Sequence, residues 1–167
     1  MAFVATRPQR MDLKKNNMLN WVFKPFDELT LTELYAIMQL RQEVFIVEQN
    51  CPYLDADGKD LKSYHLLGYA NDELIAYSRI VKPGVSYEEV SIGRVVSSTR
   101  HRGLAYGRQL MAESIAQIEK LYGPMPIRIG AQQYLQKFYE SFGFAREGEA
   151  YMEDGIPHII MVRAAVY

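Results

Sequence analysis

The 167-residue sequence has only one cysteine, Cys51. A single cysteine cannot form an internal disulfide, and such sparse use of cysteine fits a protein of a reducing compartment. Long apolar runs are also missing. None approaches the roughly 20 residues that a membrane-spanning helix requires, and the first residues lack the apolar core of a signal peptide. We therefore expect a cytoplasmic protein without a membrane segment.

An excess of charge of one sign is missing as well. The 19 basic and 20 acidic residues leave a net charge of −1, which gives no electrostatic reason to expect nucleic acid or a membrane surface as a partner. Hydrophobic residues make up 49% of the chain, and the length suits one domain with a real core. We expect a single domain over residues 18–167. Residues 1–17 carry four basic residues, one acidic residue and no apolar period, and we expect a mobile tail there.

Apolar periodicity predicts a definite order of strands and helices. Thr30 and Glu33 form a capping-box pattern at the start of the first helix, and Asn71-Asp72 and Asp154-Gly155 mark hairpin turns. The order is strand, helix, hairpin, strand, helix, strand, helix, hairpin, which predicts an α/β (α+β) fold: a central, mixed, mostly antiparallel twisted sheet flanked by about four helices. The predicted strands are 21–25, 65–70, 73–81, 90–96, 127–130, 144–152 and 156–162, and the predicted helices are 31–46, 107–122 and 132–142.

The segment between strand 90–96 and helix 107–122 has the features of an anion-binding loop. The small residues Gly103, Ala105 and Gly107 let the backbone approach a ligand closely. The start of the following helix offers unpaired N–H groups and the positive end of the helix dipole. Arg100, Arg102 and Arg108 add positive charge. The segment has neither a Walker A pattern nor G-x-G-x-x-G, so the alternative is an ordinary turn between a strand and a helix.

The loop over residues 47–60 is rich in acids. Glu48, Asp55, Asp57 and Asp60 lie close together, but their order with Gly58 does not match a calcium-binding loop, and we predict no metal site. The loop is either a solvated acidic loop or a wall of a binding site that attracts a cationic amine.

A basic residue interrupts the apolar face of helix 31–46. Arg41 stands there near the end of the helix. It either extends its charged end to solvent over an apolar stem or directs its charge into a cleft.

Two motifs resemble those of the GNAT superfamily of N-acetyltransferases. Arg102, Ala105 and Gly107 match the superfamily's coenzyme A loop, Arg/Gln-x-x-Gly-x-Gly/Ala. Ala105 stands where glycine is usual; it can still donate its N–H but disfavours a positive φ, so we expect a slightly reshaped loop or weaker binding. Residues 132–144 resemble the second motif, Asn-x-x-Ala-x-x-x-Tyr-x-x-x-Gly-Phe, with matches at Tyr139, Gly143 and Phe144, Gln132 at the asparagine position and Leu135 in place of the alanine. The order of elements is also that of the GNAT fold, and the resemblance covers nearly all of residues 18–162.

The resemblance implies transfer of an acetyl group from acetyl-CoA to an amine by direct attack. It implies that Tyr139 protonates the departing thiolate, which suits a phenol because its ordinary pKa near 10 keeps it protonated at neutral pH. A core aromatic is the alternative for Tyr139. The residues that the resemblance assigns to coenzyme A are Val95, Val96 and Ser97 for the pantetheine arm, and Arg102, Gly103, Leu104, Ala105, Tyr106, Gly107, Arg108 and Gln132 for the rest.

Longer segments resemble the ElaA-type branch of the superfamily. They are residues 40–53, 55–58, 92–95, 130–132 and 153–158. This resemblance suggests a shared cleft for an acceptor, a small molecule or a peptide with an amine, in a monomer or homodimer. The residues expected to face that cleft are Arg41, Glu48, Tyr53, Arg94 and His158; the candidates for the base that accepts the amine proton are Glu48, Glu89, Asp154 and His158.

Two other functions fit the same residues. The segment from Arg41 to Phe45 is similar to part of the acyl-homoserine-lactone synthases, which share the fold, although a recognisable coenzyme A loop argues against that activity. A non-catalytic module that binds coenzyme A is the second alternative.

Overall fold

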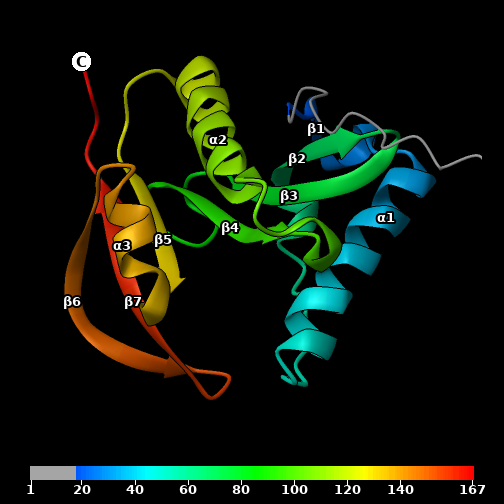
Figure 1. Cartoon of the computed structure of the whole chain (residues 1–167). Coiled ribbons are helices and arrows are strands. Elements are labelled where there is room, and N and C mark those ends of the chain that lie inside the picture. The colour runs from blue at the N-terminus through cyan, green and yellow to red at the C-terminus, as the bar shows by residue number, and fades with distance from the viewer. Residues whose placement is uncertain (1–17) are drawn as a thin grey trace, which may run out of the picture.

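The computed structural model describes residues 18–167 as a seven-stranded sheet with helices on both sides (Figure 1). The expected tail, residues 1–17, lies outside the described residues. The strand order is β1-β2-β3-β4-β5-β7-β6, and only β4 and β5 pair in parallel. The predicted mixed, mostly antiparallel sheet is therefore confirmed. The strands are β1 (Asn20–Pro25), β2 (Ser63–Ala70), β3 (Glu73–Val81), β4 (Val90–Ser97), β5 (Ile127–Gln132), β6 (Phe144–Glu153) and β7 (Ile156–Arg163).

The described part of the chain has three α-helices, slightly fewer than expected: α1 (Leu31–Arg41), α2 (Tyr106–Tyr122) and α3 (Gln136–Glu140). The capping box of α1 is formed, since the Glu33 amide donates to Thr30 Oγ1 at 3.1 Å and the Thr30 amide donates to Glu33 Oε2 at 2.8 Å. The first helix ends at Arg41 and continues as a π-helical segment over Gln42–Glu48. The prediction of a helix from residue 132 to 142 is wrong at its start, because β5 extends through Gln132 and a 3-10 turn follows.

The two faces of the sheet are covered by different helices. On α2, Leu110 packs with Leu66 and Ile75 of one face, while on α1, Ile37 packs with Leu67 of the opposite face. The alternation of adjacent residues along β2 produces this division. None of the helices in residues 18–167 is long and apolar enough to cross a membrane.

The sheet opens between β4 and β5. These strands pair only at Val90 with Ile127 and at Ser91 with Arg128, and they then diverge, as the green and yellow strands of Figure 1 show. Beyond Ser91 the edge of β4 that faces β5 has no strand partner among the described residues. A bulge at Arg94, where φ is 52°, also bends β4. Divergence and bulge together create the space for a site.

Candidate active site

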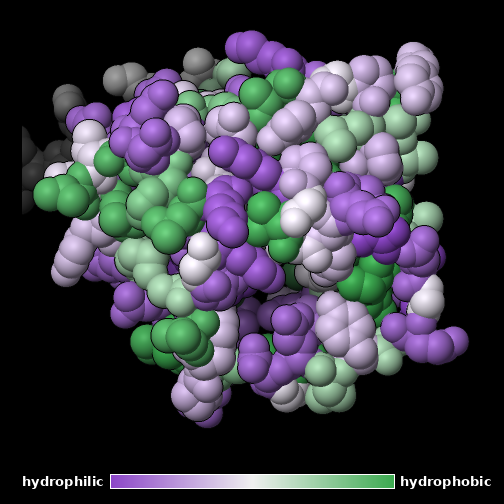
Figure 2. Space-filling model, turned by 180° about the vertical axis from the view of Figure 1, so that it is seen from behind, coloured by the Kyte–Doolittle hydropathy of each residue, from purple (hydrophilic) through white to green (hydrophobic). Residues whose placement is uncertain are grey.

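A cleft of about 890 Å³ lies where β4 and β5 diverge. Seen from behind, the surface is hollowed near its centre, and hydrophilic side chains gather on the rim (Figure 2). The cleft is lined by β4, by the segment that follows α1, by the β5–α3 segment and by the tip of the β6–β7 hairpin. The predicted site residues that line it are Glu48, Tyr53, Arg94, Val95, Val96, Ser97, Arg102, Gln132, Tyr139 and His158.

The free edge of β4 forms one wall of the cleft. On its other edge this strand pairs with β3, with Val96 opposite Tyr77 and Ser97 opposite Ala76. Backbone N–H and C=O groups on an unpaired strand edge can pair with an extended ligand as they would with another strand. The segment from Val95 to Ser97 therefore fits the extended, amide-containing pantetheine arm of coenzyme A.

The loop before α2 presents a row of free backbone donors. Within residues 18–167, no acceptor is bonded to the amides from Gly103 to Gly107, whereas the next two amides, those of Arg108 and Gln109, donate to the Ala105 carbonyl at 3.1 and 3.2 Å. Such donors at a helix start fit a phosphate group. Gly103 and Ala105 adopt left-handed conformations, with φ of 84° and 58°. Ala105 thus adopts the left-handed conformation that an alanine disfavours, at a cost of about 1 kcal/mol. The alanine therefore does not prevent the loop from turning at this position.

Arginines near the loop differ in how far their charge is neutralised. Arg102 is 55% exposed and pairs with Glu48, with 2.6 Å between Nη2 and Oε1. Arg108 lies over the Phe142 ring at 4.8 Å. Arg100 pairs with Glu73 at 2.8 Å, so it is held by β3 instead of being free for a phosphate.

Tyr139 lies on α3, where the aromatic residues Phe138 and Phe144 pack edge-on against it. The residue is 7% exposed and packs in the core, and it also lines the cleft. Its hydroxyl forms no hydrogen bond to any described residue. Burial, with a smaller contribution from Tyr134, raises the pKa of Tyr139 to about 12. The phenol therefore carries its proton throughout the physiological range, and no acceptor within residues 18–167 competes for it.

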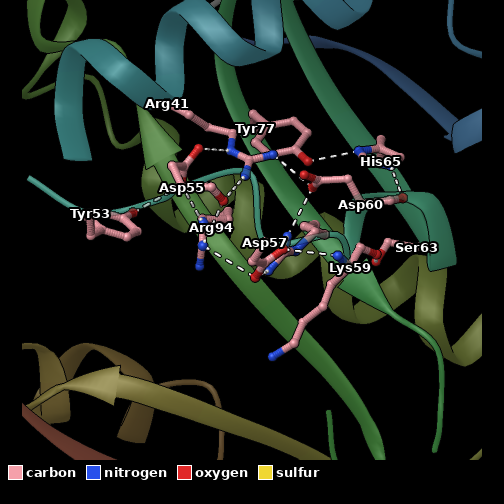
Figure 3. A network of polar contacts seen from close by, with 11 residues as sticks. Arg41, Tyr53, Asp55, Asp57, Lys59, Asp60, Ser63, His65, Tyr77 and Arg94 are labelled. Atoms are coloured by element: carbon pink, nitrogen blue, oxygen red, sulfur yellow. Dashed lines mark hydrogen bonds and ion pairs between the residues drawn. The ribbon is translucent and has the colours of Figure 1, made fainter. Parts of the chain in front are cut away.

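The prediction that Arg41 faces the cleft is wrong. Arg41 is completely buried: Nε donates to Asp55 Oδ2 and Nη1 donates to Asp60 Oδ1, both at 2.8 Å (Figure 3). The segment after α1 folds back across the end of the helix and supplies these carboxylates. A buried arginine needs such partners because an unpaired charge in the interior is costly.

The acidic loop is neither fully solvated nor a bare acidic wall: Glu48 and Asp57 line the cleft, and each is paired with an arginine. Asp55 and Asp60 are buried, and Asp57 receives two hydrogen bonds from Arg79, at 2.7 and 2.8 Å. Burial alone would raise the pKa of Asp57, but the hydrogen bonds and charge of Arg79 outweigh it and hold that pKa well below its usual range. Arg79 was not among the predicted site residues, although a charged residue inside the apolar strand 73–81 was a signal.

Arg94 connects this buried network to the cleft. Its Nε donates to Asp55 Oδ1 at 2.7 Å and its Nη2 donates to the Asp55 carbonyl at 3.1 Å. The Tyr53 hydroxyl donates to the same carboxylate oxygen at 3.0 Å, and the Tyr53 ring lies 5.7 Å from the Arg94 guanidinium. Asp55 thereby orients both cleft-lining residues.

The candidates for a base differ in their partners. Glu48 pairs with Arg102, and Glu89 pairs with Arg128 and does not line the cleft. Asp154 and His158 line the cleft. His158 Nδ1 lies 2.8 Å from the Ile156 carbonyl oxygen, which can only accept, so Nδ1 carries the hydrogen. In the neutral ring, Nε2 is then the proton acceptor.

Comparisons with known proteins agree with this geometry. The family model described as "Acetyltransferase (GNAT) domain" matches residues 41–165. Protein ElaA of Escherichia coli (strain K12) is 48% identical over 151 residues, which cover 89% of this chain and 99% of that protein.

Solved structures of similar proteins have the same fold as this chain. An acyl-CoA N-acyltransferase from Pseudomonas aeruginosa is 46% identical, with a TM-score of 0.84 over 87% of this chain and 99% of its own. The crystal structure of E. coli ElaA has a TM-score of 0.82 at 48% identity over the same shares. An aminoglycoside 6′-N-acetyltransferase complexed with coenzyme A shares the fold at 14% identity, with a TM-score of 0.66 over 87% of this chain and 98% of its own.

Proposed function

Because this chain belongs to the GNAT acetyltransferase family, we propose that it transfers an acetyl group from acetyl-CoA to an amine of a small molecule or peptide by direct attack. The proposal rests on how the β4 edge, Tyr139 and the loop before α2 are arranged around the cleft. A cleft joins the free edge of β4 to a protonated Tyr139 whose hydroxyl has no partner in the described chain, beside a loop with free amides. Acyl transfer from a thioester needs a held donor, a proton for the leaving sulfur and a base for the amine.

The chain's own groups fit the two ends of acetyl-CoA. Free amides from Gly103 to Gly107, at the positive end of α2, bind phosphate. The β4 edge from Val95 to Ser97 binds the pantetheine arm by backbone hydrogen bonds. When bound, acetyl-CoA supplies an activated acetyl group as a thioester.

Two side chains then handle protons. Tyr139 Oη donates its proton to the departing sulfur, because the hydroxyl is protonated at neutral pH and no described residue competes for its hydrogen. His158 Nε2 accepts the proton that the attacking amine loses, directly or through water. Glu48 and Arg102, paired at the cleft, hold the segment after α1 against the coenzyme A loop.

The test is amine-dependent turnover of acetyl-CoA. We expect that a panel of amines will contain acceptors that accelerate the release of coenzyme A thiol, each with an acetylated product detected by mass spectrometry. Binding of acetyl-CoA without transfer to any amine would instead support the non-catalytic module. Lactone formation from S-adenosylmethionine and an acyl donor would support the synthase.

A further inference from the structure

One end of the cleft carries positively charged groups that are only partly paired within residues 18–167. Arg94 donates from Nε and Nη2 to Asp55 and Asp57, but its Nη1 has no acceptor among the described residues. Lys59 also lines the cleft, and no described carboxylate lies within ion-pair distance of its ammonium group. In Figure 3 the Lys59 side chain extends away from the aspartates.

The buried network has no excess negative charge to balance the positive charge of Lys59. Three arginines, Arg41, Arg79 and Arg94, interact with three aspartates, Asp55, Asp57 and Asp60, so their charges cancel. The network orders the segment that carries Lys59, since the Lys59 amide donates to Asp57 Oδ1 at 3.0 Å and Ser63 Oγ donates to the Lys59 carbonyl at 2.7 Å. The lysine is thus a cation on an anchored backbone at the wall of the cleft.

The tip of the β6–β7 hairpin, which also lines the cleft, carries negative charge. Glu153 and Asp154 line it there and are exposed, and the proposed base His158 lies 3.7 Å from a Glu153 carboxylate oxygen. No lysine or arginine among the described residues pairs with these two acids. A cation at one wall and carboxylates at another favour a ligand that carries both charges and discriminate against the reversed orientation.

We propose that the acceptor is an amine that also carries an anionic group, a carboxylate or a phosphate, and that Lys59 and the free Nη1 of Arg94 bind that group. This inference rests on the proposed function. The anion lies against Lys59 and Arg94, and the amine lies toward Glu153 and His158, where it loses its proton. Lys59 acts as a residue that determines specificity and takes no part in the chemistry.

The test compares matched amines in the full-length protein. The carboxylate arm uses amino acids and their carboxamides, and the phosphate arm uses O-phosphoethanolamine and ethanolamine. We expect the unaltered protein to prefer an anionic member over its neutral counterpart in kcat/KM. Lys59→Met should lower that preference about tenfold to a hundredfold, mainly through KM, because it removes a charged hydrogen-bond donor. Lys59→Arg should restore most of it, and titration with acetyl-CoA should give the same affinity for all three proteins.

The outcomes separate this inference from the proposed function. Equal use of neutral amines, or a preference that survives in Lys59→Met, would overturn the inference while acetyl transfer stands. A protein that binds no acetyl-CoA, or transfers to no amine of either kind, would overturn both.

Discussion

Replacing Tyr139 by phenylalanine should lower kcat by about 100- to 10,000-fold, the range of a lost general acid. The substitution removes only the hydroxyl, which bonds to no described residue, and the ring keeps its edge-on packing with Phe138 and Phe144. We therefore expect the free energy of unfolding to change by less than about 0.5 kcal/mol. Steady-state kinetics with denaturant unfolding would measure both quantities.

A matched control and a pH profile sharpen this result. Tyr122→Phe makes the same change in a half-buried residue that packs on the same core but does not line the cleft, and its kcat should be normal. With Tyr139 present, the rate should rise with pH as the amine, with a pKa near 10, loses its proton. The rate should not decline at any pH up to ~11, because an acid with a pKa of about 12 is still largely protonated at that pH. Normal turnover in Tyr139→Phe would contradict the assigned role.

Replacing Asp55 by asparagine should destabilise the protein by about 3–5 kcal/mol, the usual cost of removing one partner from a buried ion pair. Asp55 is 6% exposed and accepts from Arg41 at 2.8 Å and from Arg94 at 2.7 Å. The change leaves Arg41 with only Asp60 as a charged partner in a site that is closed to solvent. Denaturant unfolding followed by circular dichroism would measure the loss.

Glu73→Gln provides the control for this prediction. It makes the same carboxylate-to-amide change in an exposed pair, Arg100 with Glu73, where we expect a loss of at most about 1 kcal/mol. Equal effects of the two substitutions would mean that the buried network contributes no more than a surface ion pair.

Local sequence signals predicted most of the fold. The capping box at Thr30 sets the start of α1, and the hairpin turn at Asn71-Asp72 separates β2 from β3. The loop before α2 was also predictable, because glycine and alanine at 103 and 105 precede a clear helical period. These signals lie within a few residues of the structure they specify, so one sequence is enough to detect them.

Contacts between distant residues were not predictable in this way. Asp55 and Arg94 are 39 positions apart, and Asp57 and Arg79 are 22 apart, so no periodicity links them. Arg41 can be buried because it pairs with carboxylates of a loop for which the sequence allowed a solvated position. The positive φ of Arg94 had no glycine to indicate it, although this bulge and the divergence of β4 from β5 create the cleft.

Calorimetric titration of the unaltered protein and of Gly107→Glu with acetyl-CoA tests whether the loop before α2 binds the cofactor. A Cβ at position 107 would meet no atom of a distant residue closer than Phe138 Cζ at 4.0 Å. Glutamate in the first turn of a helix is favourable in propensity and dipole. The fold should therefore be retained or slightly stabilised, while the new carboxylate lies against the bound phosphates.

Ala116→Glu adds the same charge to an exposed position on α2, away from the loop, and serves as the control. Acetyl-CoA should bind the unaltered protein and Ala116→Glu alike, and binding should be lost in Gly107→Glu with its circular dichroism spectrum intact. Undiminished binding to a folded Gly107→Glu protein, or no binding to the unaltered protein, would contradict the role of the loop.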